Sequence, residues 1–495
     1  MNTELDTALL PAPHAGRWKT LNLAWIAFFL TFVVWFNLAP FKSTIAKVFH
    51  LSMEQVTTLM ICNVALTIPA RILVGMLVDR FGPKRVYTGL LLSVALPCIG
   101  CAFATEYWQL VIGRLLVSCV GAGFVVGIRL VGEWFDTREI GWAEGIYGGL
   151  GNFGMAAATF GLPLAALAFG GDNGWRYAMA ASGVACILYA FVFFRLVVDT
   201  PAGESFRKPK KKGAMEVCSR GDLLGLALMQ VPMVLCMGVL VWRLTGVKLL
   251  TPAVSYGLYA ALAAVLVWQI AKIVKVNGSA LRNEPVPAGE RYSFAQVAIL
   301  CLCYAVTFGG ELAVESMLPA YFEKMFKVSV STAGMMGAGF AFASLIARPL
   351  GGLLGDRYGR KPILILSLAG SAVGFFAIGA ITAGWSIGAA MTTVIIVGFF
   401  LMAANGANFC IAPLIRKPLT GQIAGLIGAY GNVGSVLFLL IFSLAGAKVF
   451  FASMAIVAAV AFACTFLVVE PGRKKAVEES TDETPALGGI AVEPA

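Results

Sequence analysis

The stretch that decides the fold is Pro69-Ala-Arg-Ile-Leu-Val-Gly-Met-Leu-Val-Asp-Arg-Phe-Gly-Pro-Lys-Arg85, where an arginine lies inside an apolar run that ends in a charged turn. Nearly the same text returns as Ala347-Arg-Pro-Leu-Gly-Gly-Leu-Leu-Gly-Asp-Arg-Tyr-Gly-Arg-Lys361. Five residues of the first copy recur 277 positions later: Arg71, Gly75, Asp79, Arg80 and Gly82 return as Arg348, Gly352, Asp356, Arg357 and Gly359. The chain therefore contains two related halves.

The composition excludes a soluble globular protein. Hydrophobic residues make up 59% of the 495 positions, charged residues only 13%, and the mean hydropathy is +0.84, which is typical of a polytopic membrane protein. The net charge of +11 does not indicate a nucleic-acid partner, because the basic residues lie in short loops beside apolar runs, as the positive-inside rule requires. Scattered cysteines and only two histidines, His14 and His50, predict neither a metal site nor a histidine relay.

Fourteen apolar runs are long enough to cross a membrane core of about 30 Å. They cover residues 20–39, 55–78, 86–105, 108–130, 141–169, 175–198, 223–242, 249–271, 294–320, 332–354, 362–383, 386–414, 421–446 and 449–469. Basic segments at 199–222 and 272–293 flank the seventh and eighth runs. With the positive-inside rule, this pattern predicts both termini in the cytoplasm.

The repeat offset of 277 residues exceeds the roughly 200 residues that six helices and their turns need. An inserted two-helix hairpin accounts for the excess, so we expect an all-α protein with two six-helix halves and two linker helices. The predicted segments are a cytoplasmic tail at 1–19, the first half at 20–198, the linkers and hairpin at 199–293, the second half at 294–469 and a disordered tail at 470–495. This is the plan of secondary transporters that bind substrate between their repeats.

Arg71 and Arg348 each lie eight residues before the aspartate of the charged turn, about 12 Å into the membrane. A charged side chain at this depth costs on the order of 3 kcal/mol, so we expect both to face a wet cavity near the pseudo-twofold axis. Two guanidinium groups would give a site of charge about +2 that suits a small oxyanion. The alternative is that each arginine only forms a structural ion pair.

A second repeated element reads GxxGNxG and follows an offset of 280 residues. Glycines three residues apart leave a smooth strip on a helix against which another backbone can pack. Each strip carries one asparagine at its edge, Asn152 or Asn432. The glycines are Gly148, Gly151 and Gly154 in the first half and Gly428, Gly431 and Gly434 in the second.

The two charged turns resemble the GxLaDrxGrk loop motif of the major facilitator superfamily, at the end of the second helix of each half. Asp79 and Asp356 are expected to pair with helix ends or arginines where the halves meet, and release of these contacts would let the halves rock. The gating residues predicted from this motif are Gly75, Asp79, Arg80, Gly82, Arg85, Gly352, Asp356, Arg357, Gly359 and Arg360. A plain stop-transfer charge cluster is the alternative.

The paired GxxGNxG elements resemble the signature of the nitrate/nitrite porters within that superfamily, and Phe308-Gly-Gly-Glu-Leu-Ala-Val-Glu-Ser-Met-Leu-Pro319 resembles their seventh core helix. The extra hairpin is similar to that of cyanobacterial-type nitrate permeases. The resemblance implies that Arg71 and Arg348 hold nitrate. Asn152 and Asn432, whose amide groups lie at the edges of the strips, are further candidate substrate-binding residues. The resemblance also implies an aromatic wall made of Phe124, Tyr304 and Phe308; the last two, spaced i and i+4, share a helix face.

Acidic residues remain at Glu311 and Glu315, one turn apart, and at Glu144. Burial favours the protonated carboxyl while nearby arginines favour the ionised form, so Glu311 is a candidate proton carrier. A hydrogen bond that only packs helices is an equal alternative for Glu311. Arg129 is expected to face a loop together with Glu133 and Asp136.

We therefore expect a cell-membrane transporter, a monomer without a cofactor, that imports nitrate and also nitrite by alternating access with protons. Nitrate/nitrite exchange, transport of another small anion, and a nutrient sensor that uses the basic linker and acidic tail as docking segments are the alternatives. An enzyme is not expected, since the chain lacks a GxSxG motif, a metal cluster and a phosphate loop.

Overall fold

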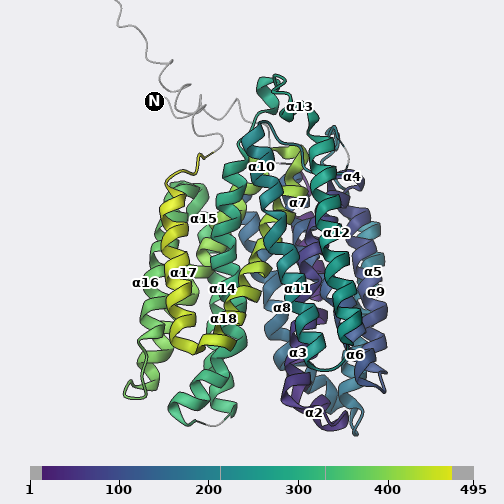
Figure 1. The fold of residues 1–495 in the computed structure, drawn as a ribbon, viewed down its shortest axis with the longest axis vertical. Coiled ribbons are helices and arrows are strands. Elements are labelled where there is room, and N and C mark those ends of the chain that lie inside the picture. The colour runs from purple at the N-terminus through teal and green to yellow at the C-terminus, as the bar shows by residue number, and fades with distance from the viewer. Residues whose placement is uncertain (1–13, 212, 329, 471–495) are drawn as a thin grey trace, which may run out of the picture.

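The computed structural model describes residues 14–211, 213–328 and 330–470, and these contain helices but no strand. This confirms the predicted all-α class. Figure 1 shows long helices packed side by side along one direction. The predicted tail at 470–495, except Glu470, and the first thirteen residues of the N-terminal tail lie outside the described residues.

The first group of helices lies on the right of Figure 1, in purple and blue, and its core includes the pairs α1 with α8 and α5 with α9. Its elements are α1 (Arg17–Phe36), η1 (Ala39–Phe41), α2 (Lys42–Val48), α3 (Met53–Ala65), α4 (Thr67–Phe81), α5 (Pro83–Ala102), α6 (Tyr107–Ser118), η2 (Cys119–Ala122), α7 (Gly123–Trp134), α8 (Ile140–Phe169) and α9 (Gly174–Leu196).

The second group lies on the left of Figure 1, in green and yellow. Its elements are α14 (Phe294–Phe326), α15 (Val330–Tyr358), α16 (Arg360–Gly379), α17 (Ile387–Ile415), η4 (Lys417–Leu419) and α18 (Thr420–Thr465). The last element is two helices in sequence, because Gly446 interrupts it with a left-handed φ of 77°. The break falls between the two final runs predicted from the sequence.

Between the groups, the chain forms α10 (Arg220–Leu228), α11 (Gln230–Gly246), α12 (Pro252–Val276), α13 (Gly278–Leu281) and η3 (Ala288–Glu290). The helix α11 packs against α3 of the first group and α18 of the second, whereas α12 is largely exposed. Two contacts join this hairpin to α18: Tyr430 Oη donates to the Met229 carbonyl at 2.9 Å, and Arg243 Nη2 donates to Ser443 Oγ at 3.1 Å.

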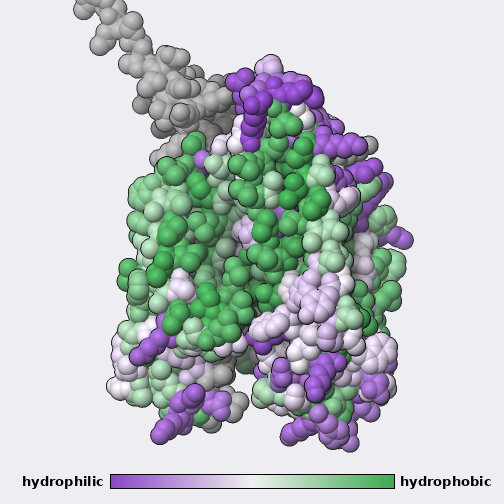
Figure 2. All heavy atoms as spheres, viewed as in Figure 1, coloured by the Kyte–Doolittle hydropathy of each residue, from purple (hydrophilic) through white to green (hydrophobic). Residues whose placement is uncertain are grey.

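Within the described residues, 12 segments are long and apolar enough to cross a membrane. Two observations account for the difference between these 12 segments and the fourteen predicted runs. The 29-residue α15 is not one of the 12 segments, and the last segment contains both helices that meet at Gly446. In Figure 2 a broad hydrophobic belt lies between two hydrophilic ends, as a membrane-spanning bundle requires.

The two groups meet closely at the end that carries Asp79 and Asp356, which we call the aspartate end. Two helix pairs make this contact, α4 with α18 and α8 with α15, and we call them the α4–α18 seam and the α8–α15 seam. At the opposite end, at the bottom of Figure 2, an opening parts the two groups. The structure is therefore closed at the aspartate end.

Candidate functional site

Two buried arginines lie at the centre of the bundle, one from each group of helices. Arg71 of α4 exposes 1% of its surface and Arg348 of α15 exposes 2%. The ring centroid of Phe308 lies 5.1 Å from the guanidinium carbon of Arg71 and 5.6 Å from that of Arg348. The structure thus brings both predicted arginines against one aromatic ring, although they are far apart in the sequence.

The two arginines differ in their partners. Arg71 donates from Nε to the Gly121 carbonyl at 3.1 Å and from Nη1 to the Gly428 carbonyl at 2.5 Å. Arg348 donates from Nη2 to Glu311 Oε2 at 2.6 Å. The ion-pair alternative therefore describes Arg348 but not Arg71, which pairs with no carboxylate in the described part of the chain. Glu311 lowers the charge of the site below the +2 expected from the arginines alone.

Glu311 of α14 is held by more than one helix. Its Oε2 also accepts a hydrogen bond from Asn405 Nδ2 of α17 at 2.7 Å. Asn152 of α8, with its amide oxygen turned toward Arg348, accepts from Nη2 of that arginine at 2.7 Å. Asn405 was not predicted from the sequence, because nothing in its own segment indicates that α17 faces α14 at this depth.

The predicted aromatic wall forms as one stack. Tyr304 and Phe308 are parallel, with centroids 4.9 Å apart and an interplanar angle of 2°. Phe124 lies 6.3 Å from Tyr304 at 5°, and its centroid is 5.9 Å from the Arg71 guanidinium carbon. Phe409, which was not predicted, packs edge-on against Phe124 and Tyr304 at 4.6 Å and 4.7 Å. The aromatic rings therefore shield the two arginines from solvent, and their π faces attract the positively charged guanidinium groups.

The two glycine strips face the arginines in a matched way. A Cβ added at Gly428 would lie 3.0 Å from Arg71 Nη1, and one at Gly148 would lie 3.6 Å from Arg348 Nη1. Each strip therefore comes close to the arginine of the other group of helices. Asn432, the counterpart of Asn152, donates instead to the Gly428 carbonyl of its own helix at 3.3 Å.

The later glycines of the strips let neighbouring helices approach. A Cβ at Gly151 would lie 1.8 Å from the Phe28 ring, and one at Gly431 would lie 2.7 Å from Tyr304. A Cβ at Gly154 or Gly434 would lie 2.3 Å or 2.1 Å from a carbonyl oxygen of α1 or α14. All six predicted glycines therefore lie on closely packed faces, and none has spare room for a larger residue on this side except Gly148.

The strips continue beyond the predicted motif. Gly141 and Gly145 of α8 recur 280 positions later as Gly421 and Gly425 of α18. A Cβ at Gly145 would lie 2.8 Å from the Arg348 carbonyl oxygen, and one at Gly425 would lie 2.5 Å from that of Arg71. The constant offset of 280 residues could have identified these four glycines from the sequence alone.

Both motif aspartates accept hydrogen bonds from the first backbone amides of the facing helix. Asp79 accepts from the amides of Gly421 and Gln422 at 2.8 Å and 2.9 Å. Asp356 accepts from those of Gly141 and Trp142 at 3.0 Å and 2.8 Å. A carboxylate at a helix N-terminus satisfies orphan amides and complements the helix dipole. The predicted contact with helix ends is confirmed at both seams.

The glycines of the charged turns have two separate roles in the structure. Gly75 and Gly352 lie in the seams, where a Cβ would fall 2.3 Å from the Gly421 oxygen and 1.9 Å from the Gly141 oxygen. Gly82 and Gly359 adopt φ values of 86° and 105°, which only glycine adopts without strain, and they turn the chain between helices.

The arginines of the charged turns do not act alike. Arg80, Arg85 and Arg357 are exposed on the aspartate end. Arg360 is buried, pairs with Asp356 at 2.9 Å, and donates to the Thr137 carbonyl of the first group of helices. Only Arg360 of the four therefore contacts the facing group directly.

Arg129 of α7 corrects an expectation. It pairs with Glu133 at 2.6 Å, as predicted, but it does not face an open loop: it is fully buried and lies 3.2 Å from Asp79 Oδ1. It also donates to the carbonyl oxygens of Lys417 and Arg207 at 2.5 Å and 2.8 Å. The connection before α18 and the linker after α9 fold over Arg129, and the sequence alone could not show this covering.

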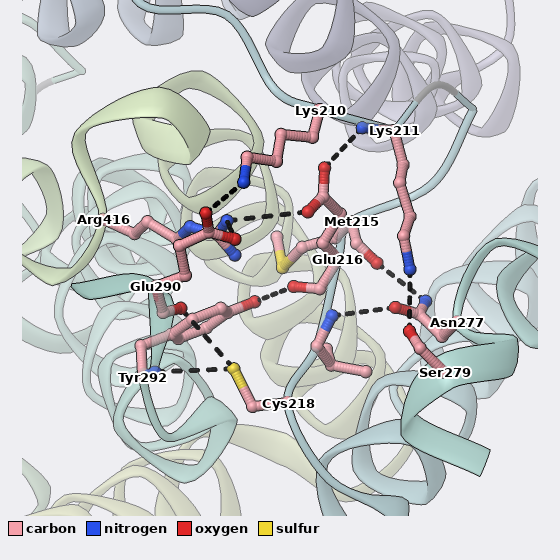
Figure 3. Close-up of polar contacts among 11 residues, drawn as sticks. Lys210, Lys211, Met215, Glu216, Cys218, Asn277, Ser279, Glu290, Tyr292 and Arg416 are labelled. Atoms are coloured by element: carbon pink, nitrogen blue, oxygen red, sulfur yellow. Dashed lines mark hydrogen bonds and ion pairs between the residues drawn. The ribbon is translucent and has the colours of Figure 1, made fainter. Parts of the chain in front are cut away.

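The linkers form a cluster around Arg416, at the aspartate end of α17 (Figure 3). Arg416 lies 3.5 Å from a Glu216 oxygen and 3.6 Å from a Glu290 oxygen, and its guanidinium carbon is 5.8 Å from the Tyr292 centroid. A hydrogen bond from Lys210 to the Glu290 carboxylate lowers the pKa of that carboxyl. Burial raises the pKa of the Tyr292 phenol, which donates to the Glu216 carbonyl. Both linker segments are thus held to the second group of helices.

Replacing Arg416 by alanine is expected to speed tryptic cleavage after Lys210 and Lys211 about fivefold, since loss of its ion pairs removes ~1 kcal/mol from the local opening energy. Time-resolved proteolysis of the solubilised protein measures this rate. The matched control is Arg195→Ala, at an exposed position of α9. Equal cleavage rates in the three proteins would show that Arg416 does not hold the linker.

Comparison with known proteins agrees with this architecture. A family model described as Major Facilitator Superfamily matches residues 24–280 and 300–492. The nitrate/nitrite transporter NrtP of Nostoc punctiforme is 44% identical over 466 residues, covering 92% of this chain and 93% of its own. NrtP of Picosynechococcus sp. is 42% identical over 499 residues, with the same coverage.

Among solved structures, the proton:xylose symporter XylE superposes with a TM-score of 0.61. The match covers 92% of this chain and 96% of XylE, at 14% sequence identity. At this identity the similarity establishes the fold alone, which is that of two bundled groups of helices.

Proposed function

Because the chain belongs to the major facilitator superfamily, and within it to the nitrate/nitrite porter family, we propose that it imports nitrate, and also nitrite, by alternating access with a proton. The observation that carries this proposal is the pair of buried arginines, one from each group of helices, against the ring of Phe308. Planar guanidinium groups match a small planar oxyanion with parallel hydrogen bonds.

Arg71 is the fixed ligand in this proposal. Its guanidinium donates to two backbone carbonyls, which orient the group without neutralising it. Asn152 and Asn432 add amide groups, and the stack of Phe124, Tyr304 and Phe308 lines the site. A larger anion, such as an organic acid, would require more polar groups than these, which is why nitrate and nitrite are preferred.

Arg348 is the switchable ligand. Its ion pair with Glu311 occupies the side of the guanidinium that nitrate would use. A proton on Glu311 removes the negative charge and releases Arg348 for the anion, so proton and nitrate bind together. Net import of an anion against a membrane potential that is negative inside needs such a driving force. Nitrate/nitrite exchange is the second candidate, and it would make uptake depend on internal nitrite.

The proposed orientation places the aspartate end and both termini in the cytoplasm of a cell membrane. Lys210 and Lys211 of the basic linker lie near Arg416 at this end (Figure 3), as the positive-inside rule requires. In that orientation the present conformation is closed to the cytoplasm and open outward. Asp79, Asp356, Arg129 and Arg360 would then form the cytoplasmic gate, and the four glycine-to-backbone approaches in the seams would let it close tightly.

Counterflow in proteoliposomes tests the proposed substrate. Vesicles loaded with nitrate, nitrite or formate are diluted into labelled nitrate at two pH gradients. We expect nitrate and nitrite to drive accumulation, formate to drive little, and an acid exterior to accelerate net uptake. Failure of internal nitrate to drive accumulation would exclude this function and favour the sensor alternative, in which the linker and tail dock partners.

Replacing Gly352 by alanine is expected to hold the gate open. Its Cβ would lie 1.9 Å from the Gly141 carbonyl oxygen, and such overpacking costs about 1–3 kcal/mol, or roughly tenfold or more in the closed population. Nitrate uptake should fall accordingly. Gly161→Ala, in open space on α8, is the matched control; unchanged uptake by the Gly352 variant would contradict the assigned seam.

A further inference from the structure

Two more carboxyl groups are buried in the helices, and neither has a hydrogen-bond partner among the described residues. Both carboxylate oxygens of Glu144 in α8 and of Glu315 in α14 are shielded from solvent and unpartnered. Buried ionisable groups within membrane helices are costly, and those that persist are usually functional. The anion site described above uses neither of them.

Glu144 lies between the anion site and the aspartate end, and it exposes 3% of its surface. One turn to either side, Gly141 approaches Asp356 and Gly148 approaches Arg348, both from α15. The titratable groups that interact with it electrostatically are Tyr147 of α8 and Cys410 of α17. No cation pairs with it in the described structure, so its carboxyl is expected to be the neutral acid while the α8–α15 seam is closed.

Glu315 lies on the other side of the anion site, one helical turn beyond Glu311. The groups that interact with it electrostatically are Glu311 of its own helix and Arg348 of α15. Residues at i and i+4 are neighbours about 6 Å apart on a helix surface. Glu315 is thus the nearest acid to Glu311 on the side where the two groups of helices are parted.

We propose that Glu315 delivers the coupled proton to Glu311 and that Glu144 removes it, an inference that rests on the proposed function. In the outward-open form the Glu315 acid gives its proton to the Glu311 carboxylate. The oxygens of Glu315 are shielded in the present structure although the residue is partly exposed, so its side chain must turn toward the opening before its carboxylate takes a proton from external water. The protonated Glu311 releases Arg348, which binds nitrate. One proton and one anion have then entered the site.

The return step uses Glu144 after the α8–α15 seam has opened. Glu144 first loses its own proton to cytoplasmic water, and its carboxylate then accepts the proton of Glu311. Because Asn152 is adjacent to the Glu311–Arg348 pair and lies eight residues, about 12 Å, along α8 from Glu144, this transfer needs water in the opened seam. The Glu311 carboxylate pairs with Arg348 again and displaces nitrate.

The closed α8–α15 seam explains why Glu144 does not let protons leak through the protein. While Gly141 and Gly352 are in contact, water from the aspartate end cannot reach Glu144. In the proposed cycle, the outer acid and the inner acid therefore exchange protons with water on their own sides at different times. The proton thus follows the same rule as the anion in alternating access: its site is open to only one side of the membrane at a time.

Glu144→Gln and Glu315→Gln test the relay in proteoliposomes. Net nitrate uptake driven by an inward proton gradient should fall at least ~tenfold, since a positioned acid or base contributes this much or more to proton transfer. Nitrate counterflow at equal, acidic pH on both sides should stay within about twofold of wild type, because exchange needs no proton release. Glu144→Asp should recover part of the net uptake.

Asp172→Asn, an exposed acid in the loop after α8, is the matched control. Equal losses of net uptake and counterflow would show that the carboxyls only support the fold, and normal net uptake would also overturn the relay. If either glutamine variant does not fold, the pH dependence of net nitrate uptake by Glu144→Asp decides. A relay role requires that the pH profile of this variant be shifted from that of the wild type. If an inward proton gradient does not accelerate nitrate uptake by the wild type, both the proton coupling and the relay are refuted. If the gradient accelerates uptake by the wild type and by both glutamine variants, only the relay is refuted.

Discussion

Nitrate uptake by proteoliposomes containing Arg71→Ala is expected to fall at least ~100-fold, because the anion loses two charge-assisted hydrogen bonds of about 1.5–3 kcal/mol each. No carboxylate in the described structure neutralises Arg71, so its full charge is available to the substrate. Arg348→Ala should be at least as severe, since it also leaves Glu311 buried without its cation. The measurement is the initial rate of uptake at external nitrate concentrations well below those that saturate the wild type.

Two further variants separate the ligand role from general damage. Arg71→Lys keeps the charge but loses the planar fork, and it should recover only a small part of the rate. Arg195→Ala, at an exposed position of α9, should transport normally. Near-normal uptake by Arg71→Ala would refute the assignment of the anion site, whatever the fate of the Arg348 variant.

Glu311→Gln is expected to abolish the acceleration of nitrate uptake by an acid exterior. Glutamine resembles the protonated acid, so Arg348 is always free for the anion and no proton is needed to release it. In the wild type, uptake should rise as the external pH falls, because more Glu311 is protonated. In the variant, the profile should be flat, while nitrate counterflow at equal pH on both sides persists.

The comparison with Asn405→Ala sharpens this test. Asn405 donates to the same oxygen of Glu311 as Arg348 does, so its removal should shift the pH profile without flattening it. A Glu311→Gln protein that still accelerates with an inward proton gradient would show that the coupled proton is carried elsewhere. Uptake that requires internal nitrite in the wild type would favour the exchange mechanism instead.

The duplicated text around Arg71 and Arg348 predicted the fold correctly, and it predicted that the two arginines lie close together, because a repeat with fixed offsets implies pseudo-symmetry. Two positions at equal depth in two related halves must approach the same axis, and Phe308 does lie against both arginines. The contacts of Asp79 and Asp356 followed from the same reasoning. The functional roles of these residues remain proposals that the experiments above address.

The ion pair between Arg348 and Glu311 could not be predicted, because it depends on how α14 is rotated about its axis against α15. In soluble proteins the apolar face of a helix reveals that rotation, but lipid and core are equally apolar here, so the pattern of hydrophobic residues carries little information. The position of Asn405 on α17 was hidden for the same reason. Arg129 was misplaced because its covering comes from Arg207 and Lys417, which are remote in the sequence.

The two matched glycines at the start of each of α8 and α18 have a bioenergetic consequence. At both seams, backbone lies against backbone so closely that an added methyl group at Gly141, Gly145, Gly421 or Gly425 would fall within 3 Å of a facing atom. A hydrated ion cannot pass through such a contact. In the cell membrane proposed for this protein, the closed seams would therefore let many copies be present without discharging the membrane potential between transport cycles.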